Sequence, residues 1–235
     1  MPDFPLDATF ADALTLAAAW HTGQYRKVPP GQTPSLPYVS HLLGVASIAL
    51  EYGADQTEAI AALLHDALED GPAHTGRTPE DLRAEMSRRF GEPVAALVDG
   101  ATDDTPPPGQ PKRPWADRKT GYLRHLPTQP APALLVSASD KLHNARTILA
   151  DISALPAGER DGYFGRFREG RDGTLQYYRL LSDQYLAAPA THTRPRLHDL
   201  ARELDRTVTA LEHATGLTSD QLRQLPLLRG ATDTE

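Results

Sequence analysis

The chain has 235 residues, a formal net charge of −7 and no cysteine. The absence of cysteine excludes disulfides, thiolate metal sites and cysteine nucleophiles, and it is typical of the reducing cytoplasm. The net negative charge argues against broad binding to nucleic acid or anionic membranes. No apolar run reaches membrane-spanning length, and the first residues do not resemble a signal peptide. We therefore expect a cytoplasmic protein with no nucleic-acid or membrane partner, in which a phosphorylated ligand would need a local basic pocket.

Helical periodicity runs through the first half of the chain, and no strand pattern or internal repeat is evident. Asp55 and Glu58 form a capping-box pattern before an apolar segment, and Gly71-Pro72 is expected to end the helix that follows. Loop-forming residues separate the first two helices over 28–37. The predicted helices cover residues 7–22, 40–52, 56–69, 79–90 and 93–98.

The second half continues the helical pattern. Residues 103–114 are too rich in proline for regular structure and are expected to form a mobile loop near the site. The predicted helices cover residues 115–125, 134–149, 174–187 and 196–214, with a break over 127–132 and a linker over 188–195. We therefore predict an all-α protein: a helical-bundle domain over residues 1–187, and a helical extension with a disordered tail over 188–235 that packs on it.

A polar cluster ends the most apolar of these segments. The run from Ala59 to Leu64 is followed by His65, Asp66, Glu69 and Asp70. On a continuous helix His65 and Glu69 would share a face, as would Asp66 and Asp70. Burying these groups beside a core is costly unless a cation compensates them, so the cluster predicts a bound divalent metal.

Two further residues complete a ligand set. His41 heads the predicted helix over 40–52, and Asp140 follows the apolar run 133–136. Alone, each has a structural explanation as a core histidine or a helix cap. Together with His65 and Asp66 they supply two imidazoles and two carboxylates, a set that suits Mn, Fe, Co or Zn with positions left for water.

These segments resemble the HD-domain phosphohydrolases and, more narrowly, the hydrolase domain of the RelA/SpoT family and its small alarmone hydrolases. The resemblance covers roughly residues 10–185. It rests on the segment His21 to Lys27, on Pro37-Tyr38 before His41, on His65-Asp66 followed by Glu69-Asp70, and on Asp140-Lys141-Leu142 followed by Asn144.

The resemblance implies hydrolysis of the 3′-pyrophosphate of guanosine 3′-diphosphate 5′-(di/tri)phosphate, with Mn²⁺ as the expected ion. It places Glu69 and Asp70 at the nucleophilic water, turns Arg26 toward the base, and gives Tyr177 a place in the nucleotide pocket. The residues themselves allow Arg26 and Lys27 to contact phosphate or stack on a purine. Asn144, the single asparagine in the chain, could reach a sugar or base. A surface role for the Arg-Lys pair and a core role for Tyr177 stay open.

Two departures from the family pattern bear on the substrate. Ser137 stands where related hydrolases often carry a lysine, and Thr105 followed by prolines stands where some carry a basic residue. Replacement charges would come from Lys112, Arg113, Arg118 and Lys119. The alternatives are therefore another nucleotide, such as a deoxynucleotide or NADPH, or a metal-bound regulatory protein without turnover. The sequence does not indicate the oligomeric state.

Overall fold

The computed structural model describes residues 6–28, 31–102 and 113–228, and α-helices dominate these ranges. No strand forms within them, and an isolated antiparallel bridge joins Tyr25 to Pro37. The predicted all-α class is confirmed. The α-helices are α1 (Ala8–Trp20), α2 (Val39–Glu51), α3 (Gln56–Leu64), α4 (Ala67–Thr75), α5 (Pro79–Phe90), α6 (Glu92–Ala101), α7 (Trp115–His125), α8 (Ala131–Ser153), α9 (Arg160–Tyr163), α10 (Gly170–Ala187), α11 (Pro195–Thr215) and α12 (Ser219–Gln224).

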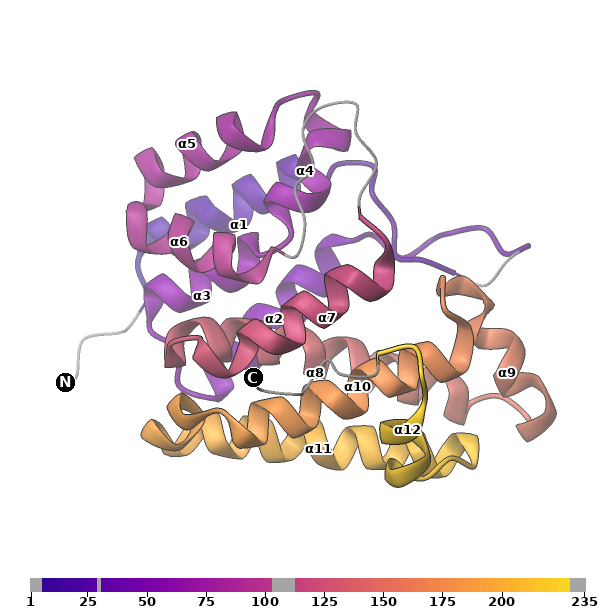
Figure 1. Ribbon diagram of the computed structural model, residues 1–235. Helices are drawn as coiled ribbons and strands as arrows, with labels where there is room; N and C mark the ends of the chain where they lie inside the picture. Colours follow the sequence, from indigo (N-terminus) through magenta and orange to yellow (C-terminus); the bar gives the residue numbers. More distant parts are fainter. Residues whose placement is uncertain (1–5, 29–30, 103–112, 229–235) are drawn as a thin grey trace.

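Helix α3 lies at the centre of the bundle. Its residues from Glu58 to Leu64 are all buried, and the helix packs against α1, α2, α6 and α8. Figure 1 shows α1 and α3–α6 gathered on one side of the molecule and α8, α10 and α11 on the other, with α2 and α7 between them. The C-terminal end of α3 therefore lies deep in the interior, where a polar cluster requires compensation.

The predicted capping box at the start of α3 is confirmed. The Asp55 side chain accepts a hydrogen bond from the Glu58 backbone N–H, and the Glu58 carboxylate accepts one from the Asp55 N–H, both at 2.9 Å. Glu58 is itself buried and forms an ion pair with Arg194, just before α11. The cap thus also joins the centre of the bundle to its C-terminal part.

The predicted continuous helix over 56–69 is wrong, because the chain breaks at His65-Asp66. Helix α3 ends at Leu64 and α4 begins at Ala67, with Asp66 at φ −95° and ψ 0°. Neighbouring residues of a straight helix point roughly 100° apart, so His65 and Asp66 could not aim at one point on it. The break lets the His65 Nε2 atom lie 2.9 Å from Asp66 Oδ2.

The predicted stop at Gly71-Pro72 is also wrong, since α4 continues through both residues and ends before Gly76, which is left-handed at φ 68°. Gly71 serves packing instead. A Cβ atom there would lie 2.8 Å from a methyl group of Leu82, so glycine allows α4 to approach α5 closely.

The C-terminal half differs from expectation mainly in helix starts. Helix α8 begins at Ala131 because Pro132 is tolerated in a first turn, where no backbone N–H is required. Helix α10 begins at Gly170. A 3₁₀ segment, Pro189–Thr193, occupies the predicted linker, and the short helices α9 and α12 were not predicted.

Helix α11 packs chiefly on α8 and α10 through a stripe of leucines and smaller residues. The domain division at residue 187 and the disordered tail stay predictions, since residues 229–235 lie outside the described ranges. Most of the predicted loop, 103–112, does too. No described helix combines the length and apolarity needed to cross a membrane.

Candidate active site

Four side chains from three parts of the chain converge at the α3–α4 break. His41 comes from the first turn of α2, His65 and Asp66 from the break, and Asp140 from the middle of α8. One ligand atom from each of His41, His65 and Asp66 lies within 4.8 Å of the other two. Asp140 Oδ1 lies 3.2 Å from His41 Nε2 and 3.6 Å from His65 Nε2. The structure therefore brings together all four residues predicted as metal ligands.

The histidine His65 is oriented for ligation. Its Nδ1 lies 2.9 Å from the Ala62 carbonyl oxygen, so Nδ1 carries the proton and donates it there. Its Nε2 is buried and makes no hydrogen bond of acceptable geometry, although Asp66 Oδ2 is close. A backbone-anchored imidazole whose other nitrogen faces carboxylates is the arrangement expected of a metal ligand. The residues present therefore fit a divalent ion.

The electrostatics of the cluster match this assignment. Burial alone would raise the pKa of Asp66, but His65 and His41 hold it well below its usual value. Lys141 and the same two histidines do so for the pKa of Asp140. Burial opposes a charge on His65, yet the two carboxylates outweigh it and raise the pKa of His65. The two carboxylates thus favour positive charge between them, which a divalent cation would supply.

His143, to which the sequence patterns above give no role, contacts one of the predicted ligands. Its Nδ1 lies 2.9 Å from His41 Nδ1. Burial lowers the pKa of His143 to about 4, which favours the neutral ring, and the Nδ1 of a neutral ring can accept a hydrogen bond from the His41 Nδ1–H. Gly44 makes room for this pair, because a Cβ there would lie 2.1 Å from the His143 ring. His143 lies three residues after Asp140 on α8, and this spacing, which places both on one helix face, is the signal that could have found it.

The two acids predicted at the water, Glu69 and Asp70, lie in the first turn of α4 and line the same cavity as the ligands. Asp70 Oδ2 accepts a 2.7 Å hydrogen bond from the side-chain amide of Gln24. The hydroxyl of Tyr38 donates to Asp66 Oδ2 at 2.5 Å. Gln24 and Tyr38 fall inside the motifs that carry the resemblance, but sequence reasoning gave neither a role.

Arg26 and Asn144 meet directly. An Arg26 Nη donates to Asn144 Oδ1 at 2.8 Å, and the Asn144 amide donates to Asp140 Oδ1 at 2.6 Å. The Arg26 guanidinium also lies 5.7 Å from the centre of the Tyr38 ring. Lys27 lines the same cavity, and its carbonyl oxygen accepts a hydrogen bond from Arg166. The segment between α1 and α2 and helix α8 thus face one pocket.

Lysine side chains of α7 and α8 bring positive charge to the site. Lys141 donates to Asp140 Oδ2 at 2.6 Å, and Lys119 lies 5.0 Å from the centre of the Tyr177 ring. Tyr177 is buried and lines the cavity, so it belongs to both core and pocket. At the position of the missing lysine, Ser137 is buried and accepts a 2.8 Å hydrogen bond from Tyr185.

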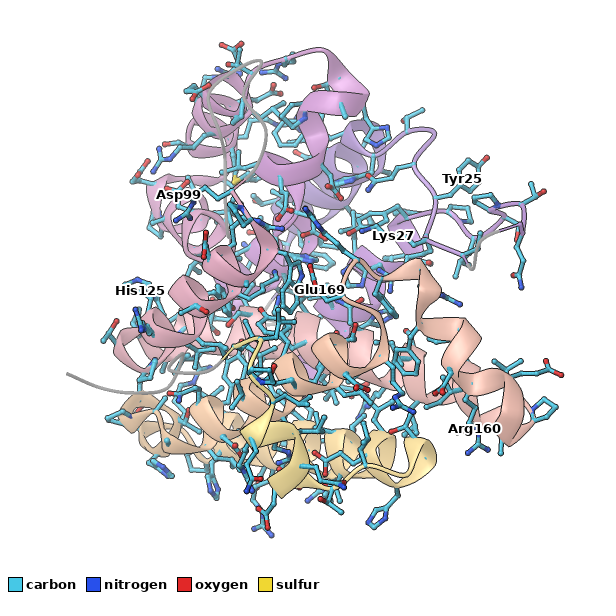
Figure 2. The ribbon with its side chains drawn as sticks, turned by 45° about the vertical axis from the view of Figure 1, so that its right-hand side comes forward. Tyr25, Lys27, Asp99, His125, Arg160 and Glu169 are labelled. Atoms are coloured by element: carbon cyan, nitrogen blue, oxygen red, sulfur yellow. The ribbon has the colours of Figure 1, made fainter. Side chains whose placement is uncertain are left out.

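Lys119, Lys141 and Tyr177 border a cavity of about 830 Å³, which is large enough for a nucleotide. A second cavity of about 210 Å³ is lined in part by Asp99, His125, Arg113 and Arg118. Figure 2 shows Tyr25 and Lys27 on one side of the molecule and Asp99 and His125 on the other. Of the proposed replacement charges, Lys119 therefore borders the candidate site, Arg113 and Arg118 border the second cavity, and Lys112 lies outside the described residues.

The chain matches a known family and is similar to known proteins. A family model described as HD domain matches residues 13–160. The chain is 36% identical over 143 residues to guanosine-3′,5′-bis(diphosphate) 3′-pyrophosphohydrolase MESH1 of Danio rerio, covering 60% of this chain and 69% of that protein. It is 33% identical over 131 residues to the bifunctional (p)ppGpp synthase/hydrolase SpoT of Escherichia coli K12, covering 52% of this chain and 17% of SpoT. The chain thus spans about a sixth of that longer relative.

The fold is also similar to those of solved structures. A structure described as a metazoan orthologue of SpoT that hydrolyses ppGpp superposes with a TM-score of 0.59 at 27% identity, covering 86% of this chain and 96% of that one. A Listeria monocytogenes structure superposes with a TM-score of 0.55 at 24% identity, covering 74% of this chain and 99% of that one, and it shows the fold alone.

Proposed function

The chain belongs to the HD-domain family, and from that premise we propose that it hydrolyses the 3′-pyrophosphate bond of guanosine 3′,5′-bis(diphosphate) and its 5′-triphosphate analogue. The products are GDP or GTP and pyrophosphate. The observation that carries the proposal is the meeting of two buried histidines and two carboxylates beside a nucleotide-sized cavity whose wall holds Glu69 and Asp70. The names of the relatives point to the same activity.

His41, His65, Asp66 and Asp140 would hold the metal, and we propose Mn²⁺ as the native ion. The set contains no sulfur, and a mixture of imidazole and carboxylate suits Mn²⁺ as well as neighbouring ions. When bound, a divalent ion lowers the pKa of water and stabilises negative charge on phosphoryl oxygens. His143 and Ala62 keep the two imidazoles turned toward the site by holding their Nδ1 atoms.

Glu69 and Asp70 take the proton of the attacking water and orient it. Both are carboxylates on the cavity wall at the start of α4, and a carboxylate within reach of the water is the usual general base. Either acid could be the acceptor, and replacing each in turn separates them.

Arg26 and Lys27 bind the nucleotide, together with Asn144 and Tyr177. Arg26 offers a planar guanidinium for stacking on the base, while Lys27 and Lys119 supply positive charge on the cavity wall. A polyphosphate substrate brings several negative charges, which these groups balance in a protein of net charge −7. We place the reaction in the cytoplasm, where such nucleotides occur.

The test is product release from a nucleotide panel with and without Mn²⁺. The panel contains the two guanosine alarmones, GTP, dGTP and NADPH. We expect pyrophosphate from the alarmones alone, and Glu69→Gln and Asp70→Asn should keep the metal while lowering turnover, roughly 100-fold or more for the proton acceptor. Preference for GTP, dGTP or NADPH would refute the substrate. Bound metal without turnover of any nucleotide would refute the enzyme.

A further inference from the structure

A chain of hydrogen bonds behind the cavity ends on Asp70. His21, at the C-terminal end of α1, lies with its Nδ1 2.6 Å from Gln24 Oε1. The Gln24 amide nitrogen in turn donates to Asp70 Oδ2 at 2.7 Å. His21 is buried, whereas Gln24 borders the cavity. A buried imidazole thus contacts the α4 acid through one glutamine.

The direction of this chain follows from the acid at its end. A carboxylate accepts hydrogen bonds, so the glutamine must present its amide N–H₂ to Asp70 and its carbonyl oxygen to His21. His21 must then donate from Nδ1. Burial lowers the pKa of His21, so the ring is neutral and carries one proton, and its buried Nε2 makes no hydrogen bond. The ring is therefore held in the tautomer that Gln24 requires.

The same imidazole supports the metal side of the site. The His21 ring stacks on Tyr38, with ring centres 5.3 Å apart and planes inclined by 19°. The Tyr38 hydroxyl donates to Asp66 Oδ2. His21 therefore lies behind both carboxylates, one reached through Gln24 and the other through Tyr38.

We propose that Gln24 is a positioning residue for Asp70 and that His21, through its Nδ1–H, fixes the orientation of Gln24. The inference rests on the proposed function, because it gives the carboxylate of Asp70 a task in handling water. With Gln24 in place, Asp70 cannot turn about its Cβ–Cγ bond without losing the 2.7 Å hydrogen bond. Neither Gln24 nor His21 needs to touch the reacting atoms.

Gln24→Met tests the first part, because methionine keeps the length of the side chain and removes the donor. We expect kcat to fall by about 10- to 100-fold, the usual effect of losing a partner that orients a site group. The KM for the alarmone and the bound metal should stay at wild-type values. In a crystal structure of this variant, Asp70 should be turned away from its wild-type position while His65 and Asp66 are unchanged.

Two replacements of His21 test the second part. Asparagine places an amide N–H₂ near the position of Nδ1, and glutamine places it near that of Nε2. We expect His21→Asn to keep kcat within about 3-fold of wild type and His21→Gln to fall as far as Gln24→Met. A role in packing alone would give the opposite order, because glutamine is closer to histidine in size than asparagine is. Thr22→Ala, an exposed neighbour at the end of the same helix, is the control and should behave as wild type.

Three outcomes would overturn the proposal. The first is an equal loss of kcat in both His21 variants. The others are a Gln24→Met variant that changes KM or metal content instead of kcat, and an Asp70 that has not moved in the structure of that variant. Failure of the proposed function looks different. If the wild type prefers another nucleotide, the same variant ratios are measured on that nucleotide. If it hydrolyses none, the position of Asp70 in the crystal structure still decides whether Gln24 holds it.

Discussion

At the scale of single residues, the proposed metal site depends on His41, His65, Asp66 and Asp140, which lie close together at the α3–α4 break. Replacing His65 or Asp66 with alanine deletes a ligand at the α3–α4 break. We expect both variants to lose bound metal and activity, because each leaves the remaining charges of the cluster uncompensated. Elemental analysis of the purified variants measures this. Full metal occupancy in either variant would disprove the ligand assignment.

Protons and metal compete for His65, and this predicts a pH dependence of metal binding. The raised pKa of His65 means that the metal-free protein holds a proton on the ring over a wider pH range than a free imidazole does. A ligating imidazole must lose that proton. Mn²⁺ affinity should therefore rise with pH until the raised pKa is passed, with proton release on binding. Calorimetric titrations in buffers of different ionisation enthalpy measure both. Affinity that is flat from pH 6 to 9 would contradict the competition.

The Gly44 position tests whether His143 supports His41. An alanine at residue 44 would drive its Cβ into the His143 ring, so we expect the Nδ1–Nδ1 contact to break and metal affinity to fall by about 10-fold or more. Gly121→Ala in α7 is the matched control, since its Cβ meets nothing within 4 Å. The control should be stabilised, by about 0.5–1 kcal/mol. Equal Mn²⁺ affinity in the two variants would rule out a supporting role.

At the scale of elements, Arg179 joins α10 to α11. Its buried guanidinium contacts Glu212 at 2.6 Å and Asp205 at 2.7 Å. Arg179→Met leaves the buried Glu212 carboxylate without this partner and should cost about 3–5 kcal/mol of unfolding free energy. Arg223→Ala removes an ion pair between more exposed groups and should cost about 1 kcal/mol or less. Urea unfolding of both variants measures the difference. Equal losses would show that burial does not set the strength of this contact.

The helices also show which features of the fold could be predicted from the sequence. The capping box at Asp55 and the helix over 196–214 follow from local patterns, and both predictions were confirmed by the structure. The break at His65-Asp66 was not predicted, because it serves side chains from α2 and α8 that are distant in sequence. The predicted ligand residues could be named from the order of their motifs along the chain. The structure brings these residues together. The His143–His41 and Gln24–Asp70 contacts depend on tertiary packing, which periodicity does not report.

At the scale of the whole molecule, the proposed metal site connects α2, the α3–α4 break and α8. An ion that binds the folded chain and not the unfolded one stabilises it, by about 2.7 kcal/mol at a free concentration 100 times Kd. A bound ion would therefore be both a structural link between these helices and the centre of the chemistry.

The central claim is that this chain cleaves the 3′-pyrophosphate bond of a guanosine alarmone. Phosphorus NMR of a guanosine 3′,5′-bis(diphosphate) digest with Mn²⁺ tests it most directly, because it identifies the bond that breaks. We predict one pyrophosphate for each GDP formed, and no reaction when a chelator replaces Mn²⁺. Orthophosphate as the product, cleavage at the 5′ end, or the same rate with chelator would contradict the account.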